Sequence, residues 1–248
     1  MDNLRNLILR TVLLAAAAGL SSCAHYKNGN HVLVSVEDQR MVLMNYGEPV
    51  KSYPVSTSKY GLGDKPGSYR TPVGHMSIHQ KIGEGAPHGA VFKARRPTGE
   101  IVRPNSPGRD PIITRILWLE GEERATKNAK RRCIYIHGTP EERNIGRPVS
   151  YGCIRMTSRD VVDLYRRVEA ETAVYVTKRE LRLAEVPSKD KELYRMIAKR
   201  TPEGSENPRL EYMDKELMAA SEPYSEDSEE KIRRIGSGRW WGGRVEND

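Results

Sequence analysis

The chain has 248 residues, which is enough for one sizeable domain or for one domain with an appendage. Its 37% hydrophobic and 30% charged residues are typical of a globular protein with a polar surface. The formal net charge of +8 favours an acidic polymer as partner. Nucleic acid is one such polymer, but the sequence has neither a basic-aromatic RNA motif nor a zinc-binding spacing.

Residues 1–22 have the order of features found in a secretory signal. Arg5 and Arg10 give a positively charged start, an apolar stretch rich in Ala and Leu covers 12–20, and small residues precede Cys23. The apolar stretch is too short for a stable membrane span. We therefore expect residues 1–22 to be a signal peptide, and export argues further against a nucleic-acid partner.

The run Leu20-Ser21-Ser22-Cys23 resembles the processing box of bacterial lipoproteins. The resemblance implies cleavage before Cys23, lipidation of its thiol and new amino group, and a stable membrane anchor, since each buried acyl CH₂ contributes about 0.8 kcal/mol. Because Ala24 rather than Asp follows, the same resemblance favours the outer membrane of a diderm bacterium. The protein is thus expected in the periplasm, with residues 23–30 as a polar tether.

Alternating apolar residues predict a mainly β domain over residues 31–178. Strands are expected at 31–36, 41–46, 50–56, 73–78, 112–119, 133–137 and 173–177. The stretch 83–110 is rich in Gly, Pro and Arg and is expected to be one long functional loop. One helix is expected after Cys153, with Thr157 as its N-cap and apolar residues at i, i+3, i+4 and i+7.

Residues 179–248 differ from this domain in composition. Charged residues dominate, strong apolar runs stop, and Trp240-Trp241 lies between glycines near the end. We expect a charged, partly disordered C-terminal extension. The tryptophan pair is interpreted either as a packing contact with the domain or as a binding element for glycan or for a partner.

Two residues with catalytic potential, His137 and Cys153, are 16 positions apart. His137 ends a predicted strand at Gly138, and a loop of this length can return the thiol beside the imidazole. An adjacent imidazole lowers the pKa of a thiol and takes its proton, which suits the pair to acyl transfer. Gly152 permits a sharp turn, after which the N–H groups of Gly152 and Cys153 can bind an oxyanion. On spacing alone, a structural His and Cys remain the alternative.

The segment Ser150-Tyr151-Gly152-Cys153-Ile154-Arg155, preceded by His137-Gly138, resembles the signature of the L,D-transpeptidase catalytic domain. Weaker matches lie at Tyr69-Arg70-Thr71-Pro72-Val73-Gly74, at 114–119 and at 145–148. The resemblance covers about residues 31–178. It implies a β-sandwich or barrel of short strands with one helix after the catalytic Cys.

The resemblance also implies roles for individual residues. Cys153 is the nucleophile and His137 the base, and the third member is a backbone carbonyl, here that of Gly138. Ser150 is expected to brace the loop. Arg155 is expected to orient a substrate carboxylate or to hold the loop, with a structural ion pair as the alternative. No metal and no cofactor are implied.

Tyr151 and Cys133 need separate interpretation. Many family members have His where this chain has Tyr151, and Tyr is not a base near neutral pH, so the tuning of the thiol is expected to differ. We place Tyr151 with Arg155 among the substrate-binding residues. Cys133 is expected to be a core thiol, because an extended strand puts it about 13 Å from His137 and so too far to form a disulfide with Cys153.

The function that the resemblance implies is cross-linking of peptidoglycan. The thiolate attacks the bond that follows the L-centre of the diamino acid at position three of a stem peptide, and an amine of a second stem resolves the thioester into a 3-3 cross-link. One alternative is an L,D-carboxypeptidase or endopeptidase that uses water on the same site, and another is attachment of a wall-anchored protein to the stem. The non-catalytic alternative is a lipoprotein that binds peptidoglycan.

Overall fold

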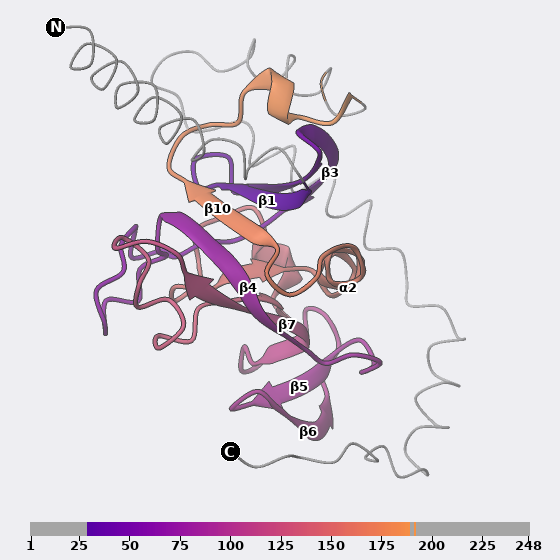
Figure 1. Ribbon diagram of the computed structural model, residues 1–248. Helices are drawn as coiled ribbons and strands as arrows, with labels where there is room; N and C mark the ends of the chain where they lie inside the picture. The colour runs from indigo at the N-terminus through magenta and orange to yellow at the C-terminus, as the bar shows by residue number, and fades with distance from the viewer. Residues whose placement is uncertain (1–28, 189–190, 192–248) are drawn as a thin grey trace, which may run out of the picture.

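The computed structural model describes residues 29–188 and residue 191 (Figure 1). The expected signal peptide, the lipidation site Cys23, almost all of the tether and the extension beyond residue 191 lie outside the described residues. In the part of the chain that is described, no helix has the length and apolar character needed to cross a membrane.

Ten strands form one sheet in the described residues. They are β1 (Asn30–Ser35), β2 (Arg40–Asn45), β3 (Glu48–Pro54), β4 (Gly74–Ile82), β5 (Ala90–Lys93), β6 (Arg96–Ile101), β7 (Ile112–Gly121), β8 (Tyr135–Gly138), β9 (Ile154–Met156) and β10 (Ala173–Thr177). The strand order is β3-β2-β1-β10-β4-β7-β5-β6, with β8 paired to β7 and β9 paired to β8. The β1–β3 meander and the β5–β6 hairpin therefore lie at opposite ends of the sheet (Figure 1).

The helical content of the described residues is small. One α-helix, α2 (Ser158–Arg167), follows β9, and two short 3₁₀ helices are η1 (Glu142–Asn144) and η2 (Leu183–Glu185). The Thr157 side chain accepts a hydrogen bond from the Asp160 N–H at 3.1 Å, so the predicted N-cap is confirmed. The expected mainly β fold with one helix after Cys153 is confirmed as well.

The main core lies between the sheet and α2. Val161 and Leu164 of α2 and Val168, which caps the C-terminal end of this helix, are fully buried against the strands. They meet fully buried residues of the sheet, which include Val32, Val34, Ile78, Leu117, Leu119, Ile136, Ile154 and Val176. Each such side chain contributes about 1.5–3 kcal/mol when it leaves water, so this layer dominates the stability of the domain.

The opposite face of β1 and β2 is also covered. Leu33, Val42 and Met44 pack there against Leu181 and Val186. We assigned residues 179–188 from the sequence to the C-terminal extension. In the structure this first part of the extension packs on the outer face of the sheet.

Three strands, β5, β6 and β9, differ from the sequence expectation. Residues 83–110 are not one long loop, because they contain the β5–β6 hairpin. Every residue of β6 is exposed, so this strand has no apolar alternation by which it could be predicted. β9 has only three residues and was also missed. It is nevertheless the strand that determines the position of Cys153.

Candidate active site

Strands β8 and β9 bring the predicted catalytic residues to one face of the sheet. They run parallel, with Ile136 opposite Ile154 and His137 opposite Arg155. Paired residues project to the same face, so Ile136 and Ile154 enter the main core while His137 and Arg155 turn the other way. Cys153 immediately precedes β9 and packs on that second face. The thiol and the imidazole are therefore on the same side of the sheet.

The position of Cys133 corrects the sequence expectation. The Cys153 sulfur donates to the Cys133 carbonyl oxygen at 3.4 Å, so the two cysteines are neighbours. The estimate of a large separation assumed that Cys153 lies beside His137. The parallel pairing instead starts β9 beside the beginning of β8, and the chain turns at Cys133, whose φ is +57°. Both thiols are free and half-buried.

The Cys153 sulfur lies in an apolar environment. Both cysteines pack against a cluster formed by Ala90, Phe92, Ile116 and Tyr135. Burial raises the pKa of the Cys153 thiol to about 11, although the Tyr135 N–H and the positive charge of Arg155 act in the opposite direction. The expected lowering of this pKa by a neighbouring imidazole is therefore wrong for this conformation. The thiol is protonated at neutral pH.

His137 is buried and neutral. Its Nδ1 lies 2.8 Å from the Gly138 carbonyl oxygen, which is the carbonyl named from the sequence. Burial lowers the pKa of His137 to about 4, and the charge of Arg155 lowers it further, against the effect of the Gly138 hydrogen bond. A neutral imidazole that contacts a carbonyl through Nδ1 carries its proton there, so Nε2 keeps a free lone pair. Within the described residues, no hydrogen bond joins this imidazole to the Cys153 sulfur.

The turn before Cys153 is held by Ser150. The Ser150 Oγ donates to the Cys153 carbonyl at 2.6 Å and accepts from the Gly152 N–H at 3.2 Å. The sequence predicted the N–H groups of Gly152 and Cys153 as donors to an oxyanion. Because the Gly152 N–H is bonded to Ser150, only the Cys153 N–H of these two remains for that role. Gly152 has a φ of +120°, and a Cβ at this position would lie 3.3 Å from the Arg70 carbonyl oxygen. The backbone conformation thus favours glycine, and the space for a Cβ is tight.

Thr71 is a residue of the site that the sequence reasoning missed. Its Oγ1 donates to the Gly152 carbonyl at 3.0 Å and accepts from the Ser58 N–H, also at 3.0 Å. Thr71 is fully buried. The only signal was the weak family match that includes Thr71-Pro72, just before the strand expected at 73–78. The structure shows that this threonine fixes the backbone next to the nucleophile.

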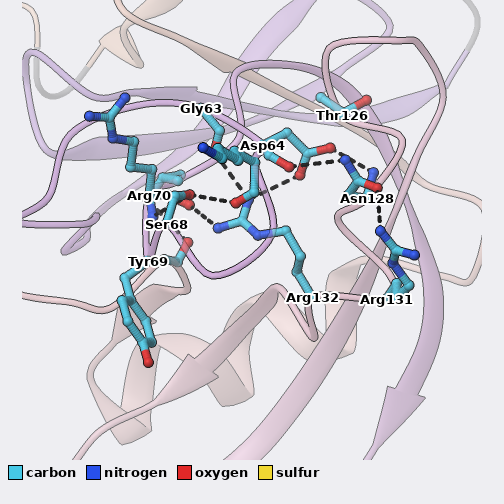
Figure 2. A network of polar contacts seen from close by, with 12 residues as sticks. Gly63, Asp64, Ser68, Tyr69, Arg70, Thr126, Asn128, Arg131 and Arg132 are labelled. Atoms are coloured by element: carbon cyan, nitrogen blue, oxygen red, sulfur yellow. Dashed lines mark hydrogen bonds and ion pairs between the residues drawn. The ribbon is translucent and has the colours of Figure 1, made fainter.

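A buried ion pair supports the loop that lines the turn (Figure 2). Arg132 Nη1 lies 3.0 Å from Asp64 Oδ1, and both side chains are only 7% exposed. Arg132 Nη2 donates to the Arg70 carbonyl at 2.6 Å, the same oxygen that approaches Gly152. The Asn128 N–H donates to the other Asp64 oxygen at 2.6 Å. Nothing in the sequence marked this pair, since Arg132 belongs to a basic run that reads as solvated surface.

The predicted substrate-binding residues have different surroundings. The Arg155 guanidinium is 2.7 Å from Asp110 Oδ2, and both side chains are largely buried. This geometry favours the structural ion pair among the alternatives for Arg155. Tyr151 is 54% exposed and its hydroxyl accepts a hydrogen bond from Lys59. Among the residues that the structure describes, no group of three or more His, Cys, Asp or Glu is placed to hold a metal.

A half-buried thiol and a neutral imidazole thus lie on one face of a mainly β domain. The family model of the L,D-transpeptidase catalytic domain (YkuD) matches residues 29–176. The chain belongs to this family.

Individual relatives match over parts of their length. YqjB of Bacillus subtilis (strain 168), whose name places it among the L,D-transpeptidases, is 37% identical over 60 residues, which are 24% of this chain and 32% of YqjB. A solved L,D-transpeptidase of Xylanimonas cellulosilytica is 16% identical, with 67% of this chain and 69% of that one covered and a TM-score of 0.41. An Enterococcus faecium L,D-transpeptidase C442S mutant is 16% identical, with 60% and 50% covered and a TM-score of 0.40. This chain thus spans about a third of YqjB, and the family assignment stands on residues 29–176.

Proposed function

We propose that the protein is a peptidoglycan L,D-transpeptidase that forms 3-3 cross-links between stem peptides through a thioester on Cys153. The observation that carries the proposal is the arrangement of His137: its Nδ1 is directed to the Gly138 carbonyl, its Nε2 is free, and it shares a face of the sheet with the Cys153 thiol. That arrangement suits a general base for a cysteine nucleophile.

In the first half-reaction, His137 Nε2 takes the proton of the Cys153 thiol while the sulfur attacks the carbonyl carbon of the third stem residue, which is bonded to the nitrogen of the fourth. The Cys153 N–H binds the oxyanion. The C–N bond then breaks, and the imidazolium returns the proton to the amine of the departing fourth residue. In the second half-reaction an amine of another stem attacks the thioester, and its proton passes through His137 back to the sulfur.

The pKa values of the resting site decide how the proton moves. Burial raises the pKa of the Cys153 thiol to about 11 and lowers the pKa of His137 to about 4, so the resting pair is a neutral thiol beside a neutral imidazole. The ion pair is therefore not preformed. The proton leaves the sulfur as the new S–C bond forms, once the thiol has turned from the Cys133 carbonyl toward the imidazole.

The supporting residues follow from the contacts of the turn. We assign Ser150 and Gly152 to holding the Cys153 backbone, and Arg155 to holding the loop through Asp110. Tyr151 remains a substrate-contacting residue because it is exposed at the edge of the site. The reaction as written needs no cofactor.

We also propose that the protein acts in the periplasm, anchored to the outer membrane by lipid on Cys23. The support is the ordered sequence of charge, apolar stretch, small residues and Cys in the first 23 positions. Mass spectrometry of the N-terminal peptide tests this: acyl chains on Cys23 are expected, and an unmodified Cys23 after export would contradict the anchor.

The reaction is tested by incubating the purified chain with disaccharide-tetrapeptide and analysing the products by mass spectrometry. A cross-linked dimer that has lost one fourth residue is expected. Tripeptide alone would make the protein an L,D-carboxypeptidase, and binding without any product would make it a peptidoglycan-binding lipoprotein. Cys153→Ala is expected to abolish the dimer. Cys133→Ser is the matched control, because it keeps the carbonyl that the sulfur contacts, and it is expected to retain the dimer.

A further inference from the structure

Three exposed tyrosines gather beside the nucleophile. Tyr60, Tyr69 and Tyr151 are 45%, 57% and 54% exposed. Their ring centroids are 5.9 Å apart for Tyr60 and Tyr69, 5.6 Å for Tyr60 and Tyr151, and 6.0 Å for Tyr69 and Tyr151. We call these three rings the tyrosine patch. Exposed aromatic surface that gathers in one place is typical of binding sites rather than of an inert protein surface.

The patch is held in place by buried contacts beneath it. The Ser58 Oγ donates to the Tyr69 carbonyl at 2.5 Å and accepts from the Tyr60 N–H at 3.0 Å. Ser58 itself is buried. Tyr69 leads into Arg70, whose carbonyl is held by Arg132, and its ring points away from the Asp64–Arg132 network (Figure 2). Because the backbone under the rings is already ordered, a ligand loses little free energy in ordering them.

A cation lies among the rings. Lys59 Nζ is 4.5 Å from the ring centroid of Tyr151 and 5.3 Å from that of Tyr60. It also donates a hydrogen bond to the Tyr151 hydroxyl at 3.2 Å, and this contact raises the pKa of Lys59. The patch therefore combines open ring faces and phenolic hydroxyls with one fixed positive charge.

These features select the chemistry of a ligand. A pyranose ring has an apolar C–H face that stacks on an aromatic ring and a polar rim that hydrogen-bonds to hydroxyls. A carboxylate on the same ligand pairs with Lys59. A peptide is ordinarily held by side-chain pockets or by a free strand edge, whereas the patch offers tilted ring faces that are open to solvent. The combination favours an anionic sugar over a peptide.

We propose that the tyrosine patch and Lys59 form a subsite for a carboxylate-bearing aminosugar strand, that is, for the glycan to which the stem peptides are attached. The identity of the polymer rests on the proposed function. Tyr151 is two residues before Cys153, so a strand on the patch lies next to the nucleophile and delivers its own stem to the thiol.

Binding to peptide-free sugar tests the subsite independently of the reaction. Cys153→Ala protein is titrated calorimetrically with two probes: strands of alternating N-acetylglucosamine and N-acetylmuramic acid, which carry lactyl carboxylates, and neutral chitotetraose. Tyr60→Ala and Tyr69→Ala are each expected to weaken binding of both probes about tenfold. Lys59→Gln is expected to weaken only the carboxylate-bearing strand, and added salt should reproduce that loss in the parent protein.

Tyr46→Ala is the matched control, since Tyr46 is 73% exposed but lies in the β2–β3 turn. It is expected to bind both probes like the parent protein. Melting temperatures check that the exposed substitutions leave the fold intact. Absence of binding by the Cys153→Ala parent, or equal binding by the patch variants and Tyr46→Ala, would overturn the subsite.

Kinetics separate this proposal from the proposed function. In protein that keeps the native Cys153, Tyr60→Ala is expected to raise the KM for disaccharide-tetrapeptide about tenfold more than it raises the KM for the sugar-free tetrapeptide. An equal rise for both substrates would make the patch a peptide site and refute the saccharide proposal. Sugar binding without any cross-linked product would refute the transpeptidase function and leave the subsite standing.

Discussion

The sheet core and the turn that carries Cys153 are held by different forces. Leu117 and Ile136 in the core are fully buried among other apolar side chains. The turn depends on directional contacts from Ser150, Thr71 and the carbonyl that Arg132 holds. Apolar burial is non-directional and adds up over the domain, whereas a hydrogen bond fixes particular atoms. Core substitutions should therefore lower the stability of the whole domain, and turn substitutions should also change the surroundings of the thiol.

The largest effect on stability is expected from Arg132→Met. The change leaves the Asp64 carboxylate buried without its ion-pair partner, which typically costs about 3–5 kcal/mol in the free energy of unfolding. Urea denaturation measures this loss. Arg167→Met is the matched control, because the Arg167–Asp163 pair on α2 is much more exposed than the Asp64–Arg132 pair, and such i,i+4 pairs contribute only about 0.3–0.5 kcal/mol. Equal losses in both variants would show that the buried pair does not support the turn.

A core substitution of comparable size should behave differently. Leu117→Ala removes a fully buried side chain and is expected to cost about 2–5 kcal/mol in the free energy of unfolding. Under conditions where both variants remain folded, the rate of Cys153 alkylation should stay unchanged in Leu117→Ala and rise in Arg132→Met, because only the second change loosens the turn. Equal changes in the alkylation rates of the two variants would contradict the distinction between the sheet core and the turn.

The decrease in the free energy of unfolding at acidic pH should depend on the protonation of His137. Its pKa is about 4 in the folded chain against an ordinary value near 6.5, so the unfolded chain binds the extra proton between these values. Stability is therefore expected to fall as pH drops from 6.5 to 4, by about 3 kcal/mol for this residue. Urea midpoints measured at several pH values test this.

His31 and His88 also have pKa values lowered by burial and shift the curve in the same direction. His137→Gln isolates the contribution of His137, because it keeps the other two residues. The variant should lose less stability than the parent chain over the same pH range. A curve that is parallel to that of the parent would contradict the lowered pKa of His137.

Ser150→Ala is expected to have the smallest of these effects on stability. The change leaves the buried Gly152 N–H and the Cys153 carbonyl without the Ser150 hydroxyl, at a cost of about 1–3 kcal/mol. Formation of the cross-linked dimer should fall more steeply than this loss implies, because the Cys153 N–H is no longer positioned. Ser68→Ala removes a hydroxyl from an exposed turn and serves as control. Full activity of Ser150→Ala would show that the turn holds its shape without this contact.

Local patterns in the sequence determined much of the fold. Apolar alternation located seven of the ten strands, and the spacing of apolar residues with Thr157 located α2. Such signals succeed because each strand or helix face must match its own period before it can pack. The motif around Cys153 and His137 indicated the family, and the Gly138 carbonyl contact with His137 was expected from it.

The tertiary structure alone decided the surroundings of the thiol. Parallel pairing of β9 with β8 placed Cys153 against Cys133 and Tyr135, and the resulting burial raised the pKa of a thiol that we expected to be lowered. The Asp64–Arg132 pair and the tyrosine patch likewise join residues far apart in the chain. A local pattern records which face of an element is buried, but not which distant element will cover it. Burial, charge pairing and pKa all depend on that second choice.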